Sequence, residues 1–85
     1  MKTIRHVLVV EGGLIGNNAT KFVNKCSMFK SSITVSLEDK TVNAKSILAV
    51  LYLRATQFDN IEMTICGADE EIAQDVLKHF LKDNF

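Results

Sequence analysis

The sequence lacks proline and tryptophan altogether and contains little cysteine, with two residues in 85. Cys26 and Cys66 lie far apart and belong to no Cys-x-x-Cys pair, so the sequence argues against a zinc site or a redox motif. In a reducing compartment both are expected to be free thiols, with Cys26 on the buried side of a helix.

Net charge and long apolar runs are also missing. Ten basic residues balance ten acidic residues, so no overall field favours nucleic acid or an anionic membrane surface. The longest run of apolar residues, Ile47–Leu53, is too short to cross a bilayer. The N-terminus has no signal-peptide pattern. We therefore expect one cytoplasmic domain over residues 1–85, without a metal, a cofactor, or a nucleic-acid or membrane partner.

The first third of the chain shows a strand pattern followed by a helix pattern. Residues 3–10 are rich in β-branched residues and predict a strand, with one face made by Ile4, His6, Leu8 and Val10. After Gly12 and Gly13, either Asn17 or Asn18 is expected to cap a helix. The apolar side chains of this helix recur at i, i+3, i+4 and i+7: Ala19, Phe22, Val23 and Cys26.

Three further strands and a short helix follow. Residues 32–37 alternate apolar and hydroxyl side chains, which predicts a strand with one buried face. Residues 41–43 predict its short partner strand. Ser46 is expected to cap a short apolar helix, Ile47–Leu53. Residues 61–65 alternate again and predict the last strand.

The last helix has the clearest pattern. Acidic residues at its start and lysines towards its end complement the helix dipole: Asp69, Glu70, Glu71, Lys78 and Lys82. Its predicted apolar stripe is Ile72, Ala73, Val76, Leu77, Phe80 and Leu81. The order βαββαβα, with one apolar face on each element, predicts an α+β two-layer sandwich in which helices pack on one side of an antiparallel sheet.

Three blocks of the sequence resemble motifs of a known family. Residues 13–19 (GLIGNNA), 41–50 (TVNAKSILAV) and 66–70 (CGADE) are similar to blocks of the HPr family, the histidine phosphocarriers of the bacterial sugar phosphotransferase system. The resemblance covers nearly the whole chain, and the second and third blocks match closely. It implies an HPr-like open-faced sandwich with three helices on one face and four strands in the order 1-4-2-3.

The first block departs from the family pattern, which reads Gly-(Leu/Ile)-His-Ala-Arg-Pro-Ala. The resemblance places Ile15 where the family has the histidine that receives the phosphoryl group from Enzyme I. Asn17 replaces the arginine, Asn18 replaces the proline, and Gly16 stands where alanine is usual. Isoleucine has no lone pair and the fixed positive charge is gone, so we expect a degenerate site without a catalytic residue, in a protein that is not an enzyme.

The second block contains Ser46. In Gram-positive members of the family, HPr kinase/phosphorylase phosphorylates this serine, and the product is a corepressor for a LacI-type catabolite control protein. A serine at a helix N-terminus suits an added phosphate. The resemblance implies a partner-binding surface beside it: Thr20, Lys45, Ile47, Leu48 and Leu51. The plainer alternative is that Ser46 is only a helix cap and that Ile47–Leu53 belongs to the core.

Two further departures lie in the loop after the short helix. Arg54 and Phe58 stand where the family usually has glycine. The resemblance therefore implies a loop of altered shape, in which Phe58 adds exposed apolar surface.

The leading hypothesis is a protein–protein interaction module of carbon catabolite regulation, controlled by phosphorylation at Ser46. It is similar to the Crh branch of the family, which lacks the histidine and keeps the serine. Two alternatives stay open: an unphosphorylated adaptor or decoy for HPr partners, and a phosphocarrier that uses another residue, such as His6 or His79. A monomer or a weak dimer is expected.

Overall fold

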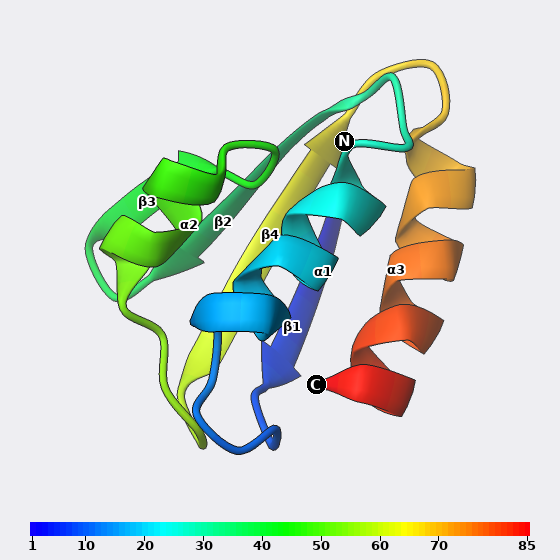
Figure 1. Cartoon of the computed structure of the whole chain (residues 1–85). Helices are drawn as coiled ribbons and strands as arrows, with labels where there is room; N and C mark the ends of the chain where they lie inside the picture. Colours follow the sequence, from blue (N-terminus) through cyan, green and yellow to red (C-terminus); the bar gives the residue numbers. More distant parts are fainter.

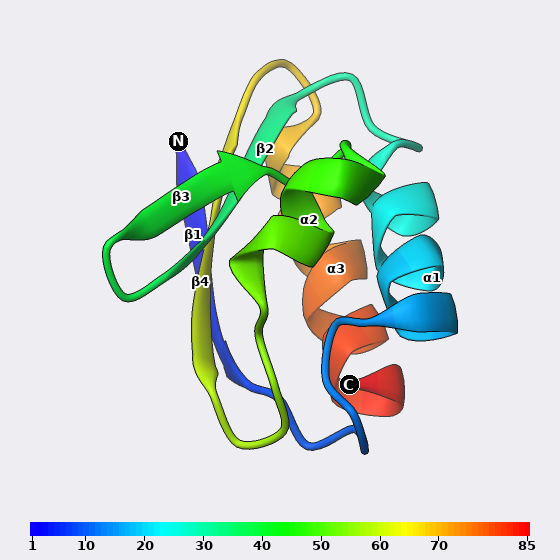
Figure 2. The same cartoon turned by 60° about the vertical axis from the view of Figure 1, so that its left-hand side comes forward.

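The structure, a computed structural model, describes all residues 1–85 as four strands and three helices in the predicted order. These are β1 (Lys2–Val7), α1 (Gly16–Cys26), β2 (Ser32–Leu37), β3 (Lys40–Asn43), α2 (Ile47–Leu53), β4 (Asn60–Cys66) and α3 (Glu70–Asn84). The strands form one antiparallel sheet in the order β1-β4-β2-β3. All three helices cover the same face of the sheet (Figures 1 and 2). The predicted α+β sandwich and its strand order are confirmed.

The helix layer and the sheet share one hydrophobic core. The three helices and the strands β2 and β4 contribute fully buried side chains to it, such as Phe22 from α1, Met63 from β4 and Leu77 from α3. Burial of one apolar side chain of this size contributes about 1.5–3 kcal/mol. The core therefore fixes where each helix lies on the sheet and, with it, where each helix begins.

The first strand is shorter than the sequence predicted. We expected a strand over residues 3–10, and β1 ends at Val7. The N–H of Leu8 still donates to a carbonyl of the neighbouring chain segment, but the N–H groups of Val9 and Val10 donate to the carbonyl oxygen of Phe85. Because Leu8 is buried and Val10 packs on the core, the apolar alternation continues after the sheet ladder has ended.

The predicted cap of α1 was wrong. The N-cap is Ile15, in extended backbone, and no side chain caps the helix. The amide of Asn18 donates backwards, to the carbonyl oxygens of Gly13 at 2.9 Å and Glu11 at 3.3 Å. It therefore holds the preceding loop instead of an N–H group of the helix, although the four apolar positions of the helix are buried as predicted.

One member of the predicted stripe on α3 does not face the core. Ala73, Leu77 and Leu81 are buried, whereas 65% of Ile72 is exposed. Buried positions four residues apart define the inward line of the helix, and Ile72 lies about 100° around the axis from Ala73. The apolar character of Ile72 therefore did not predict its environment.

Asp69 precedes α3 but does not cap it. Its carboxylate accepts hydrogen bonds from the N–H of Lys30 at 2.8 Å and from the N–H and hydroxyl of Ser31. The hydrogen bond from the Ser31 hydroxyl, followed by that from Lys30, lowers the pKa of Asp69 from 3.8 to about 2. The ionised carboxylate thus ties the turn after α1 to the start of α3.

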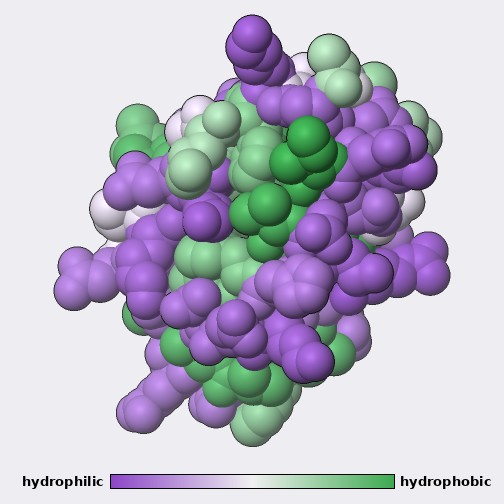
Figure 3. Space-filling view, turned by 90° about the vertical axis from the view of Figure 1, so that its right-hand side faces the viewer, coloured by the Kyte–Doolittle hydropathy of each residue, from purple (hydrophilic) through white to green (hydrophobic).

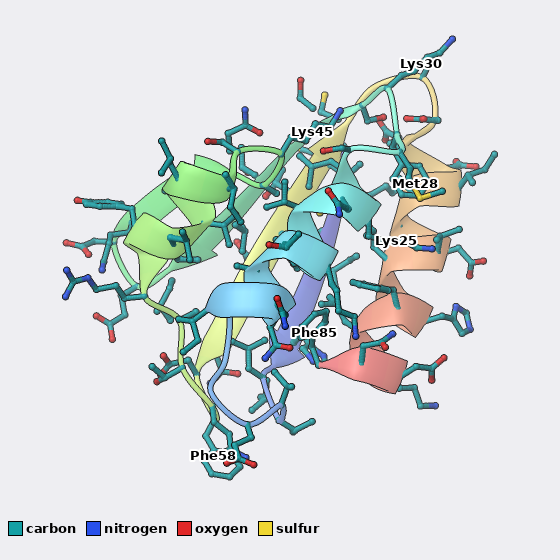
Figure 4. All side chains as sticks on the ribbon, viewed as in Figure 1. Lys25, Met28, Lys30, Lys45, Phe58 and Phe85 are labelled. Carbon is teal, nitrogen blue, oxygen red and sulfur yellow. The ribbon has the colours of Figure 1, made fainter.

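Two residues of the loop around α2 have left-handed backbone. Arg54, the C-cap of α2, has φ 54°, and Phe58 has φ 75°. Glycine adopts this region without steric cost, which explains why glycine suits both positions. Phe58 is 70% exposed, as predicted, and points away from the body of the molecule (Figure 4).

Candidate functional site

The loop before α1 is pressed against the segment that follows α2. The N–H of Leu14 donates to the carbonyl oxygen of Ala55 at 2.9 Å. A Cβ on Gly13, which has φ 68°, would collide with that carbonyl and with the backbone of Thr56. Only glycine allows the two segments to approach this closely, and the contact fixes the chain just before Ile15.

Ile15 occupies the mouth of α1. Its carbonyl oxygen accepts hydrogen bonds from the N–H groups of Asn18 and Ala19, while 51% of the residue remains exposed. Gly16 follows with φ 53° and nothing within 4 Å of the place where its Cβ would stand. The helix begins without an acidic side chain in its first turn, and Asn17 there is exposed and uncharged. The start of α1 thus combines backbone amides with an apolar side chain, and no side chain in it could accept a phosphoryl group on nitrogen.

The two histidines lie elsewhere. His6 is in β1, opposite Ile61 of β4, with its Nε2 buried and without a hydrogen-bond partner. His79 is exposed on α3, where its Nδ1 contacts the carbonyl oxygen of Asp75 at 2.8 Å. The fold therefore brings neither imidazole to the start of α1.

Ser46 is the N-cap of α2, as the sequence predicted. Its backbone is extended, and its hydroxyl oxygen accepts a hydrogen bond from the N–H of Ala49 at 3.3 Å. Its carbonyl accepts from Val50 at 3.0 Å, and its own N–H donates to Asn43. Asn43 also accepts from the N–H of Lys45 through its side chain at 2.9 Å. The turn after β3 is therefore hydrogen-bonded on both sides of Ser46, and the side chain of Ser46 is only partly buried.

The side chain of Lys45 turns away from Ser46 and towards the end of α1. Its Nζ donates to the carbonyl oxygen of Phe29 at 2.6 Å. Burial raises the pKa of the nearby Cys26 thiol to about 12, against the opposing effect of the Lys45 charge. Lys45 was predicted to bind a partner, whereas in this structure its ammonium group is hydrogen-bonded to the turn after α1.

The remaining predicted partner-binding residues lie exposed on α1 and α2, which pack against each other. Ile15, predicted as part of the degenerate site, and Tyr52, which the prediction missed, are exposed beside them. We call this set the α1–α2 surface: Ile15, Thr20, Ile47, Leu48, Leu51 and Tyr52. Leu48 is 77% exposed and Tyr52 65%. Leu48 and Tyr52 are four residues apart in a helix, a spacing that puts both on one face and could have identified Tyr52 from the sequence. The helix layer that carries this surface is seen best in Figure 2.

Two other kinds of site are absent. No group of three or more histidine, cysteine, aspartate or glutamate side chains lies close enough together to hold a metal ion. None of the three helices combines the length and the apolar character needed to span a bilayer.

Comparisons with known proteins agree on one family. The family described as "PTS HPr component phosphorylation site" matches residues 3–83. The phosphocarrier protein HPr of Xylella fastidiosa (strain 9a5c) is 36% identical over 84 residues, which are 96% of this chain and 94% of the relative.

Solved structures of the family have the same fold. HPr-C-His from Thermoanaerobacter tengcongensis superimposes with a TM-score of 0.92 at 33% identity, over 96% of this chain and 92% of that chain. The Bacillus subtilis protein Crh, described as a domain-swapped dimer, gives a TM-score of 0.76 at 26% identity, over 89% of this chain and 87% of its own. On these grounds the chain belongs to the HPr family of the phosphotransferase system.

Proposed function

We propose that this HPr-family protein does not carry phosphate on a histidine and acts instead through regulated contacts with other proteins. The observation that carries the proposal is Ile15 at the N-cap of α1, half exposed at the mouth of the helix. Residues 13–19 resemble the family's phosphorylation block, and that resemblance puts Ile15 in the place of the histidine.

Phosphoryl transfer on a side chain needs a nucleophile with a free lone pair and fixed positive charge or donors around the moving group. Ile15 offers a hydrocarbon surface only, and Asn17 offers no charge. His6 and His79 lie on other elements. The start of α1 is therefore suited to contact with an apolar surface and unsuited to phosphoryl exchange.

Ser46 is the proposed point of control. A phosphate there would add about −1.5 to −2 charges at the positive end of α2, where the N–H of Ala49 already meets the serine oxygen. Such a charge stabilises a helix by about 0.3–1 kcal/mol, which is too little to alter the fold. It would, however, place strong negative charge beside Ile47 and Leu48 and so change which proteins can dock on the α1–α2 surface.

The proposed partners are an HPr kinase/phosphorylase and a LacI-type catabolite regulator. The block with Ser46 supports the first, and the exposed α1–α2 surface supports the second. The charge near the site is reduced, because Asn17 is neutral and the ammonium of Lys45 is bound to Phe29. Binding to the regulator should therefore be weaker than for relatives with an arginine at position 17.

A second candidate function is an adaptor that docks on HPr partners without phosphorylation. The favouring observation is that Ile15 adds apolar area to the α1–α2 surface in the unmodified protein. Apolar side chains at the centre of a contact contribute most of the binding energy of typical interfaces.

One titration distinguishes the two functions. The Ser46-phosphorylated and unmodified proteins are titrated against a LacI-type catabolite regulator, with Asn17→Arg as the comparison. Regulated docking predicts tighter binding of the phosphorylated form and a further gain of about tenfold from Asn17→Arg, the equivalent of one charge-assisted hydrogen bond. Equal affinities of the two forms would remove Ser46 from the mechanism and favour the adaptor.

A further inference from the structure

A basic groove lies between β1 and α3, on the side of the molecule away from the α1–α2 surface. It has a volume of about 590 Å³, and its lining is Thr3, Ile4, Arg5, His6, Val9, Lys78, Leu81 and Lys82. No acidic residue lines it. Figure 3 shows the side of the molecule on which α3 lies, where hydrophilic side chains surround small apolar areas.

The lysines of the groove have no partners within the protein. The four ion pairs of the structure include neither Lys78 nor Lys82, although the two side chains stand one helical turn apart on α3. His6 adds a buried Nε2 without a hydrogen-bond partner. Buried polar atoms are nearly always paired in folded proteins, so this groove has both unused positive charge and an unused polar atom.

The wall of the groove opposite α3 is an open sheet edge. β1 is the outermost strand and pairs only with β4. The N–H of Leu8 donates to Asp59 in the same register, and bonding alternates along an antiparallel pair. The N–H and C=O groups of Thr3, Arg5 and Val7 therefore point away from β4, at the open edge of the sheet. Thr3 and Arg5 also line the groove.

One of these outward groups, the carbonyl of Thr3, already accepts a hydrogen bond from within the protein. The side-chain amide of Gln74 on α3 donates to the carbonyl oxygen of Thr3 at 2.9 Å. It closes the edge next to the start of β1. The outward backbone groups of Arg5 and Val7 have no partner. Together they offer two N–H donors and two C=O acceptors, in the positions where an added antiparallel or parallel strand would pair.

We propose that this groove binds an extended acidic peptide segment of another protein, which adds to the sheet as a fifth strand beside β1. Strand addition supplies affinity through main-chain hydrogen bonds and specificity through alternate side chains. Partner side chains opposite Ile4 and His6 would point to the side of α3, where carboxylates meet Lys78 and Lys82. The segment therefore needs acidic residues at every second position.

The positive charge of the groove favours an acidic segment over a second copy of the chain as its occupant. The Arg5 side chain is already paired with Glu62 at 2.8 Å, so the free charge of the groove comes from the two lysines. Two β1 edges paired with each other would bring two sets of Lys78 and Lys82 towards one another, and like charges across an interface oppose binding. An acidic segment instead neutralises the unpaired lysines. The proposal is independent of Ser46 and of the α1–α2 surface.

Binding is tested by fluorescence anisotropy with a labelled peptide of alternating glutamate and threonine, about the length of a typical strand. Lys78→Glu with Lys82→Glu should weaken binding at least about tenfold. The control, Lys21→Glu with Lys30→Glu, has the same net charge and should change the affinity less than about twofold. Equal loss in both variants, or competition by inorganic phosphate at the same concentration as by unlabelled peptide, would overturn the proposal in favour of general anion attraction.

Strand addition itself is tested by amide hydrogen exchange of the unmodified protein. Saturating peptide should slow exchange at Arg5 and Val7 at least about tenfold, while amides already bonded to β4 change little. Val7→Pro removes one outward N–H at an edge position that tolerates proline and should weaken peptide binding. Unchanged exchange at Arg5 and Val7 would overturn the proposal, as would protection of both without peptide together with a dimer in sedimentation, which would assign the edge to a second copy.

Discussion

Arg54→Gly should make this protein more stable. Arg54 ends α2 with φ 54° and ψ 38°, and its side chain takes part in none of the hydrogen bonds or ion pairs of the structure. A left-handed conformation costs a residue with a Cβ about 1–2 kcal/mol. Glycine avoids that cost but loses about 0.5–1 kcal/mol through the larger entropy of its unfolded state. The balance is a gain of about 0.5–1 kcal/mol, or about 2–8 °C in melting temperature for a domain of this size.

The assay is thermal and urea unfolding of Arg54→Gly beside Arg54→Ala. The alanine variant removes the same side chain and keeps the left-handed backbone with a Cβ, so it should not be stabilised. An equal response of the two variants would show that the arginine side chain, and not the backbone conformation, sets the energy at this position.

Three further changes test other parts of the fold. Asp69 has a folded pKa of about 2, below its ordinary 3.8, so its hydrogen bonds stabilise the protein above about pH 4. This contribution is lost as the pH falls towards 2, and Asp69→Asn should remove that pH dependence in urea unfolding from pH 2 to 6. Ser46→Ala removes the cap of α2 and should cost about 1 kcal/mol in the same assay. Gly13→Ala forces a Cβ into the carbonyl of Ala55 and should lower the free energy of unfolding by at least about 1 kcal/mol. Gly16→Ala should cost less, because the backbone is left-handed at both glycines but there is space for a Cβ only at Gly16.

Local patterns in the sequence were enough to predict most of the architecture. α2 has the predicted bounds, Ile47–Leu53, because Ser46 is a capping residue next to an apolar run. The strand over residues 61–65 was recognised by strict alternation and extends by one residue at each end. In both cases the signal lies within a few neighbouring residues, where propensity and pattern agree.

The errors came from hydrogen bonds that the residue pattern did not show. β1 ends early because Val9 and Val10 bond to Phe85, at the other end of the chain. Asn18 does not cap α1 because its amide reaches back to Gly13. The first partner, Phe85, depends on how α3 packs on the sheet and has no local signal. The second lies only five residues from Asn18, but it depends on the conformation of the glycine loop, which residue type alone did not specify.

In the candidate site, too, features with a local sequence signal were predicted and features that depend on tertiary contacts were not. The place of Ser46 and the exposure of Leu48 follow from a short helix that cannot bury every side. The engagement of Lys45 by the carbonyl of Phe29 depends on the close approach of two turns far apart in sequence. The basic groove was missed for that reason too: Lys78 and Lys82 looked like ordinary helix-end charges until β1 was placed beside them.

The central claim is that the start of α1 cannot take a phosphoryl group. Its most direct test is the intact mass of the protein after incubation with phosphoenolpyruvate and Enzyme I, beside the triple variant Ile15→His, Asn17→Arg, Asn18→Pro as the positive control. We expect an unchanged mass for the natural chain and the addition of one phosphoryl group to the triple variant. A phosphoryl group on the natural chain, at His6, His79 or any other residue, would contradict the account.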